Sequence, residues 1–351
     1  MSTLQSVDDD VWPSLPYSEW KPTLETLHMW TQIVGKVKLA LTPFLNDWWN
    51  ITFFVTARGL STSMIPFGQR VFQVDFDFID HRLTIQVSDG RSRTMALTAR
   101  AVADFYQEFM THLNSLDIQV RINTHPVEVD NGIPFEADNV HTSYDPAFVN
   151  RWWRILVGVS RVMERYRTGF VGKSSPVQFF WGSFDLATTR YSGRPAPPRE
   201  WPTQWMALGA RHEQALAGFW PGNERLPEPA FVAYTYPEPP GCRTAALQPD
   251  AAYFHPELAE FILPYVRVRV APNPDQLILD FYRSTYEIGA TLAGWDRAAL
   301  EVSDPVDVSA GGAAHHCPPS VRGDRPSRST TACRTASSPC EQPRESRRRL
   351  P

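Results

Sequence analysis

The sequence predicts an α+β fold in which two tandem units, each a helix, several antiparallel strands and a closing helix, form one pseudo-symmetric domain. Residues 50–63 (NITFFVTARGLSTS) align without a gap on residues 176–189 (PVQFFWGSFDLATT). In the preceding helices, WTQIVG at 30–35 matches WRILVG at 153–158. This order indicates a duplication in which Phe53 superposes on Phe179.

A third match lies in the two closing helices, where Asp-Phe-Tyr occurs at 104–106 and again at 280–282. It predicts that Asp104 superposes on Asp280. The duplicated domain is expected to cover residues 12–301, with halves at about 20–115 and 145–295.

In the first half, apolar residues recur at helical spacing over residues 24–41 until Pro43 stops them. Strands are expected at 51–56, 71–79, 83–87, 94–97 and 118–122. The turn Asp89-Gly90 joins the third strand to the fourth, and a helix at 99–113 precedes the last strand. Asp75 and Asp77 lie on the polar face of their strand, where solvent exposure explains them better than a cation site.

In the second half, Asp145-Pro146 opens a helix that runs to about residue 166. A strand at 177–183, a Pro-rich insertion at 195–229, a strand at 231–236 and an apolar run at 261–270 follow, and a helix at 275–292 closes the unit. The order of the first half is thus repeated with one long insertion.

Composition excludes several classes of protein. Of 351 residues, 42% are hydrophobic and 12% aromatic, which is ample for a packed core, and the net charge of −4 argues against nucleic-acid binding. The acidic start MSTLQSVDDD and the lack of a long apolar run predict a cytoplasmic protein that neither enters nor crosses a membrane. Only Cys242 of the four cysteines precedes residue 302, so we expect no disulfide framework and no metal site.

The last segment, residues 302–351, has a different composition, with eight arginines, eight serines and seven prolines and almost no apolar periodicity. Such a segment cannot bury enough apolar surface to offset its ordering entropy, which predicts a disordered tail. Its His315-His316-Cys317 group has the spacing of no common zinc finger. Truncation after Glu301 should therefore leave the melting temperature nearly unchanged.

Familiar catalytic motifs are not matched. Gly172-Lys173-Ser174 is similar to the end of a phosphate-binding loop, but Arg167 stands where that loop requires glycine. We expect an ordinary turn there, and no cofactor is indicated.

A single ligand site in a duplicated scaffold needs residues that only one half supplies. Asp185 and Arg190 align with Gly59 and Met64 of the first half. In the opening helices, three polar residues align with Arg151, Ile155 and Val159 of the second half, and these are His28, Gln32 and Lys36. Each half therefore has its own polar set.

We expect one cleft between the halves to gather these residues within roughly 10–12 Å, the span of a small ligand. Trp181 and Asp185 would share a strand face, and Arg190 and Arg194 would follow in a Gly-containing turn that suits an anion. His28 could exchange protons near neutral pH. The alternative is an ion pair between Asp185 and Arg190 that only holds the turn.

Five segments together resemble a family of uncharacterised bacterial proteins, a domain of unknown function. They include TLHMWTQIVGK (26–36), FDFIDHRL (76–83), FFWGSFDLATTRYSGR (179–194), GFWPG (218–222) and STYEIGATLAGWDR (284–297). The resemblance covers about residues 12–301 and implies no activity, ligand or catalytic residue.

Three kinds of function agree with the sequence. The first is the binding of a small ligand, with an anion as one option, in the cleft between the halves. The second is an enzyme that uses the same cleft, and the third is a protein-interaction module, since twelve tryptophans also suit an interface. Whether the protein is an enzyme, and whether it forms oligomers, is left open by the sequence.

Overall fold

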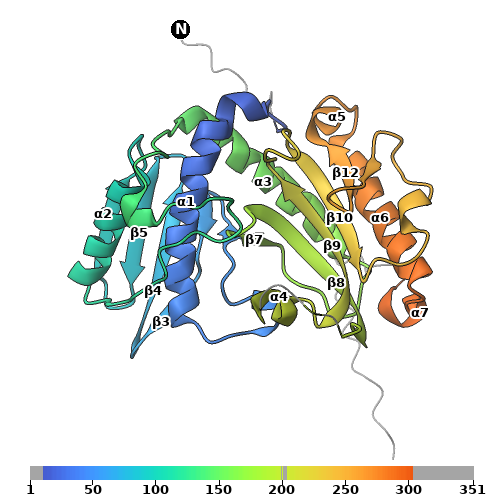
Figure 1. Ribbon diagram of the computed structural model, residues 1–351, viewed down its shortest axis with the longest axis horizontal. Coiled ribbons are helices and arrows are strands. Elements are labelled where there is room, and N and C mark those ends of the chain that lie inside the picture. Colours follow the sequence, from blue (N-terminus) through green and yellow to red (C-terminus); the bar gives the residue numbers. More distant parts are fainter. Residues whose placement is uncertain (1–10, 199, 201–203, 303–351) are drawn as a thin grey trace, which may run out of the picture. The chain divides into compact units, whose positions relative to one another are not determined.

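The computed structural model describes residues 11–198, 200 and 204–302, and it shows the α+β class that the sequence predicts (Figure 1). The first half contains α1 (Tyr17–Leu41), η1 (Asn46–Trp48), β1 (Phe54–Val55), β2 (Gly59–Ser61), β3 (Ile65–Phe67), β4 (Arg70–Asp77), β5 (Arg82–Val87), β6 (Ser92–Ala96), α2 (Val102–Ser115) and η2 (Phe135–Ala137). The expected tail begins at residue 302, and all of it beyond Val302 lies outside the described residues.

The second half contains α3 (Pro146–Arg167), β7 (Gln178–Phe180), β8 (Asp185–Pro195), α4 (Gln204–Gly209), β9 (His212–Trp220), β10 (Ala230–Tyr236), η3 (Cys242–Thr244), β11 (Tyr253–His255), β12 (Glu260–Pro264), α5 (Tyr265–Arg269), α6 (Pro274–Leu292) and α7 (Arg297–Leu300). In both halves, over the residues that the structure describes, every helix is too short or too polar to cross a membrane.

Each half forms its own antiparallel sheet. The first has the order β1-β2-β4-β5-β6, with β3 paired to β4, and the second has the order β11-β12-β10-β9-β8-β7. The helices contact one another in the order α2, α1, α3, α6, and α3 and α6 lie against one face of the second sheet (Figure 1). The other face of that sheet is not covered by these two helices.

The long helices of the second half begin where local chemistry favours it. Asp145 caps α3 by accepting from the backbone N–H groups of Ala147 and Phe148, and Pro146 follows in the first turn. Asn273 caps α6 in the same way, with Pro274 after it. The residues that α3 and α6 bury recur at helical spacing, as the sequence indicates.

Three expectations for the elements were wrong. The segment 118–122 is not a strand, and the apolar run at 261–270 divides at Pro264 into β12 and α5. The insertion at 195–229 contains α4 and β9, and β9 is a central strand of the second sheet. Since β9 is buried on both faces, it lacks the alternation that reveals a half-exposed strand.

The two sheets meet at a single antiparallel bridge between Phe53 and Phe179. Each backbone N–H donates to the carbonyl of the other residue, at 2.9 and 2.8 Å. Pairing of two equivalent residues is what a two-fold axis requires. The hairpin registers differ, however, because Phe54 pairs with Ser61 whereas Phe180 pairs with Asp185, so the exact repeat stays a prediction.

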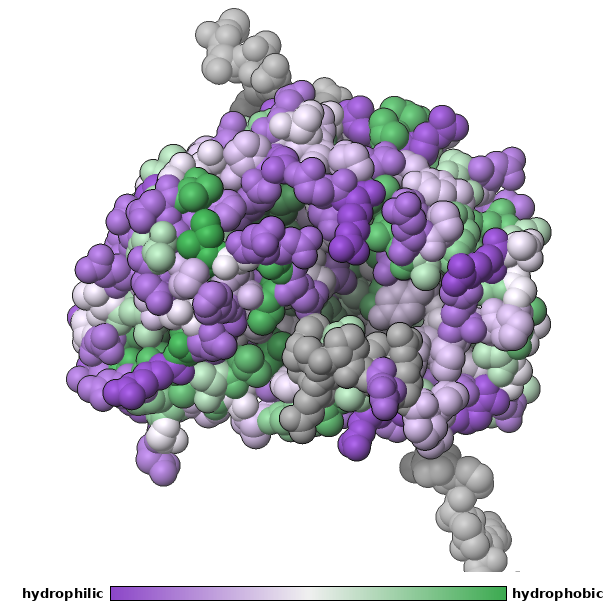
Figure 2. All heavy atoms as spheres, in the orientation of Figure 1, coloured by the Kyte–Doolittle hydropathy of each residue, from purple (hydrophilic) through white to green (hydrophobic). Residues whose placement is uncertain are grey.

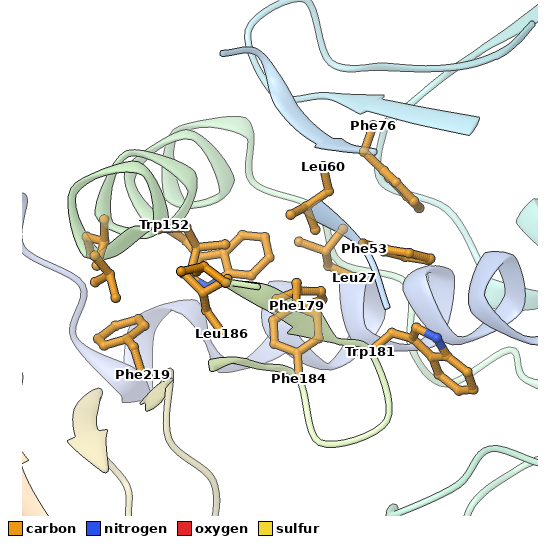
Figure 3. Close-up of a cluster of buried hydrophobic side chains, with 14 of the residues drawn as sticks. Leu27, Phe53, Leu60, Phe76, Trp152, Phe179, Trp181, Phe184, Leu186 and Phe219 are labelled. Atoms are coloured by element: carbon orange, nitrogen blue, oxygen red, sulfur yellow. The ribbon is translucent and has the colours of Figure 1, made fainter. Parts of the chain in front are cut away.

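Aromatic side chains fill the core around this bridge (Figure 3). The Trp152 ring of α3 stacks on Phe184 at a centroid distance of 4.8 Å, and Phe184 meets the edge of Phe179 at 5.1 Å. Phe53 continues the cluster toward Phe76 at 6.3 Å. The residues that the sequence aligned as duplicated strands thus lie together at the centre of the core.

Asp75 and Asp77 of β4 are less exposed to solvent than the sequence predicts. Asp77 is only 7% exposed and accepts from Arg58 at 2.7 Å, while Asp75 is partly buried and accepts from Gln73. Asp77 is protected because the chain turns back at Ile79 and Asp80, whose N–H groups also bond to its carboxylate.

The described chain ends in a short pairing with the loop after α3. Val302 donates its N–H to Gly169 O at 2.8 Å, and Val171 donates to Leu300 O at 2.8 Å. Glu301 accepts from the Tyr286 hydroxyl, also at 2.8 Å. The fold therefore extends one residue beyond the expected boundary.

Truncation after Val302 should leave the melting temperature within about 1 °C of the full chain, whereas truncation after Asp296 should lower it by about 4–8 °C. The longer truncation removes Leu300, Glu301 and Val302 and leaves Val171 N–H and the Tyr286 hydroxyl without these partners. Differential scanning calorimetry of both proteins measures the difference. Equal melting temperatures for the two truncations would contradict it.

Candidate functional site

The polar face of α1 holds the tip of the β7–β8 hairpin. His28 Nε2 lies 3.1 Å from Trp181 O and 2.8 Å from Gly182 O. Because carbonyl oxygens only accept, these two contacts indicate that Nε2 carries the hydrogen, and the Gln32 side-chain nitrogen lies 3.0 Å from the same atom. Burial lowers the pKa of His28 to about 4, so the imidazole is neutral near pH 7. His28 therefore positions the hairpin rather than exchanging protons there.

Gln32 holds the loop between the halves. Its side-chain amide donates to Val127 O and accepts from Val127 N–H, both at 2.8 Å, as a neighbouring strand would. Gln32 is fully buried. This paired contact fixes the backbone immediately before Glu128.

Replacing Gln32 with methionine should cost about 1–3 kcal/mol, because both polar groups of Val127 lose their partner. Amide hydrogen exchange at Val127 should also become faster. The matched control is Gln107→Met on the exposed side of α2, which should be nearly neutral. Unchanged exchange at Val127 would show that the loop is held by other contacts.

Trp181, in the turn of the β7–β8 hairpin, packs against α1. Its indole N–H donates to Ile51 O at 2.8 Å, and its ring packs directly on Gly35. The tip of the hairpin, residues 181–184, is a turn, so Trp181 and Asp185 do not share a strand face as expected. His28, Gln32 and Trp181 are nevertheless brought together.

Three acidic residues, Glu128, Asp185 and Glu260, are termed the acidic cluster, because the charge of Asp185 acts on the other two. Burial raises the pKa of Asp185 to about 6. Burial and then the charge of Asp185 raise the pKa of Glu128 to about 7 and that of Glu260 to about 7. Glu128 is nevertheless exposed to solvent, so its charge is screened more than the charges of Asp185 and Glu260.

Glu128 and the positions just before the other two acids have left-handed backbone conformations. The φ angles are 57° for Glu128, 61° for Phe184 and 56° for Ala259. Such conformations cost non-glycine residues about 1–3 kcal/mol and persist where the surroundings impose them, often at functional sites. Backbone strain therefore lies at Glu128 and directly before Asp185 and Glu260.

Asp185, Tyr234 and Glu260 lie on the face of the second sheet opposite α3 and α6, termed the open face. Each precedes a residue that faces the helices or the main core, namely Leu186, Thr235 and Phe261. Since side chains alternate along a strand, the three residues point the other way. Burial, and then the charges of Glu260, Asp185 and Glu128, raise the pKa of Tyr234.

The open face also has an apolar floor. A second hydrophobic cluster, separate from the main core, contains Leu226, Ala230, Val232 and Ile262, with Leu216, Trp220 and Leu258 packed against it. Figure 2 shows that the molecular surface is hollowed near the centre of this view, over the second sheet. Acidic groups beside apolar walls are a usual composition for a ligand site.

The expected arginines do not join this site, and the expected turn at 190–194 is the end of strand β8. Arg190 lies on the helix side, over the Tyr166 ring at 3.8 Å and the Tyr286 ring at 4.5 Å. Arg194 pairs with Glu213 at 2.7 Å. The alternative ion pair between Asp185 and Arg190 is not formed either.

Lys36 is the last of the expected residues. It is 6% exposed, and its ammonium lies 6.0 Å from the centroid of the Phe135 ring. Burial lowers its pKa. Lys36 belongs to the same helix face as Gln32 but contacts η2, not the acidic cluster.

Sequence reasoning missed Glu128, Tyr234 and Glu260. Glu128 lies in a loop with no periodic pattern, and Glu260 precedes an apolar run as an ordinary flanking charge would. The strand alternation around Tyr234 was the one available signal.

Within the described part of the chain, no three His, Cys, Asp or Glu residues lie close enough to hold a metal ion. The geometry thus defines an α+β protein of two joined sheets, with Asp185 and Glu260 beside an apolar cluster on one face of the second sheet.

The chain belongs to DUF5996, a family of unknown function, whose model matches residues 12–302. This confirms the resemblance to a domain of unknown function. No curated protein and no solved structure matches the chain.

Proposed function

We propose that the protein binds a small, positively charged organic molecule on the open face, at the acidic cluster. The observation that supports this is the set of carboxyl groups whose pKa values are raised by burial, with the charge of Asp185 adding to the effect at Glu128 and Glu260. A cationic ligand relieves that repulsion. With Arg190 and Arg194 directed elsewhere, an anionic ligand loses its basis.

The ligand's charged group is an ammonium or guanidinium rather than a metal ion. An organic cation can bond to carboxylates that are too far apart to share one metal. Trp220 and the apolar floor offer a surface for its hydrocarbon part, and aromatic faces attract cations. The site then selects amines that carry an apolar body.

A panel of primary amines, guanidinium compounds, polyols and carboxylates should separate these ligand classes by thermal shift at pH 8. We expect apolar amines to raise the melting temperature and carboxylates to have no effect. Asp185→Asn should abolish the shift, while the control Asp104→Asn, on the exposed surface of α2, should keep it. Stabilisation by carboxylates in place of amines would contradict the proposal.

The affinity for an amine should rise from pH 5 to pH 8. The cation binds the ionised carboxylates, and with pKa values of about 6 and 7 these groups lose their protons across that range. Isothermal titration calorimetry should also detect proton release on binding below pH 7. A pH-independent affinity would place the ligand away from the acidic cluster.

The same pKa values favour an enzyme as the second candidate. Carboxyl groups near pKa 7 can donate and accept protons at neutral pH, which general acid–base catalysis requires. Incubation of each bound amine with the protein, followed by mass spectrometry, separates the candidates. Turnover that is lost in Glu260→Gln would show catalysis, and unchanged ligands would show binding alone.

A further inference from the structure

A separate cavity of about 310 Å³ lies between α1 and the residues that precede α3. Its walls include Glu25, His28, Met29, Val129, Ile133 and His141. The loop that supplies Glu128 to the acidic cluster also supplies Val129 to this cavity, so the two places are neighbours. The cavity combines apolar walls with an imidazole.

His141 is held by a buried carboxylate. Its Nδ1 lies 2.7 Å from Asp138 Oδ2, and Asp138 is 0% exposed. The other carboxylate oxygen accepts from the N–H groups of Val140 and His141 at 3.1 Å each. Because a carboxylate only accepts, Nδ1 carries the hydrogen, and the lone pair of the neutral ring is on Nε2.

Helix capping does not account for the imidazole. The turn also caps α2, but it does so through backbone carbonyls, with Val102 N–H on His141 O and Ala103 N–H on Asp138 O. Capping therefore needs no imidazole. In the described part of the chain, no protein group is bonded to His141 Nε2.

We propose that this cavity binds a small hydroxyl-bearing molecule with an apolar body, and that His141 Nε2 accepts the hydrogen bond from its hydroxyl group. Asp138 fixes the tautomer that leaves Nε2 free to accept, as a carboxylate partner does for an imidazole base. Met29, Val129 and Ile133 contact the apolar body. Asp138 acts through His141 and is a positioning residue.

Nitrogen NMR of histidine-labelled protein tests the first step. His141 should show the Nδ1–H tautomer at pH 8, the minor form of free imidazole. Observation of the Nε2–H tautomer would overturn the proposal, since that nitrogen would then donate instead of accept.

Titration with phenol and with toluene tests the second step. Both rings fit apolar walls, but only phenol has a hydroxyl group. Phenol should bind about fivefold more tightly and shift the His141 Nε2 resonance, the difference expected for one hydrogen bond. Equal affinities, or a phenol complex that leaves His141 unshifted, would overturn it.

The variant Asp138→Asn keeps an oxygen for the two backbone N–H groups but presents an amide N–H₂ to Nδ1. The ring should change to the Nε2–H tautomer, and the preference for phenol over toluene should disappear. If the variant proves unfolded by its melting curve, the wild-type titrations still decide the matter. Asp185→Asn should leave phenol binding unchanged, so failure here and failure of the amine proposal are separate results.

Discussion

Replacing Gly35 with alanine should destabilise the fold by about 2–3 kcal/mol, although alanine is the better residue in a free helix by about 1 kcal/mol. An added Cβ would lie 2.3 Å from the Trp181 ring, far inside van der Waals contact. Trp181 has little room to move, because it is 3% exposed and its indole is bonded to Ile51 O. The strain must spread into α1 or the β7–β8 hairpin.

The second half offers a matched control for this change. Gly158 of α3 aligns with Gly35 in sequence and also faces an indole, that of Trp12, but an added Cβ there would lie 3.1 Å from the nearest ring atom. Gly158→Ala should therefore change stability by less than about 1 kcal/mol. Urea denaturation of both variants measures the difference, and equal effects would show that the Gly35–Trp181 contact adapts easily.

Much of the fold was predictable because its signals are local. The helical spacing in α1, α3 and α6 and the alternation in β4 and β5 depend on residues close in sequence. The bounds of α3, α6, β4 and β5 were confirmed within about two residues, whereas α1 begins at Tyr17, seven residues before the expected start at residue 24. β9 was missed for the opposite reason, since burial on both faces removes the alternation. Its sequence, HEQALAGFW, was therefore assigned to the expected insertion.

The candidate site was predicted less well, and one error was avoidable. Asp185 and Arg190 are five positions apart, an odd separation, so a continuous strand directs them to opposite faces. The structure does this, with Asp185 on the open face and Arg190 among aromatic rings. Strand geometry alone could have excluded both the shared site and the ion pair.

The acidic cluster itself could not be found from sequence. Glu128, Asp185 and Glu260 are far apart along the chain, and they approach only because the Gln32–Val127 contact places one loop and the sheet pairing places the other two. Their left-handed neighbours are also ordinary residues, with no glycine to indicate the conformation. Only the assembled structure shows that the charges interact.

Replacing Asp185 with asparagine should stabilise the fold at pH 8 by about 1–3 kcal/mol, in contrast to most substitutions of partly buried residues. The folded-state pKa of about 6 exceeds the ordinary value of 3.8, so the folded protein holds this proton more tightly than the unfolded chain. The stability from that proton is fully present below about pH 3.8 and is lost as pH rises through about 6. Asparagine is uncharged at every pH and can still accept from the Ser183 hydroxyl.

The gain should consequently depend on pH, which distinguishes it from a change in packing. Urea denaturation at pH 8 should favour the variant, and near pH 4 the two proteins should be almost equally stable, because Asp185 is then mostly protonated in the wild type. Asp104→Asn should show no such crossover. A variant that is more stable at pH 8 yet no longer responds to amines would show that the wild type keeps a destabilising charge for binding. A loss of stability at both pH values would instead make Asp185 a structural residue of the hairpin.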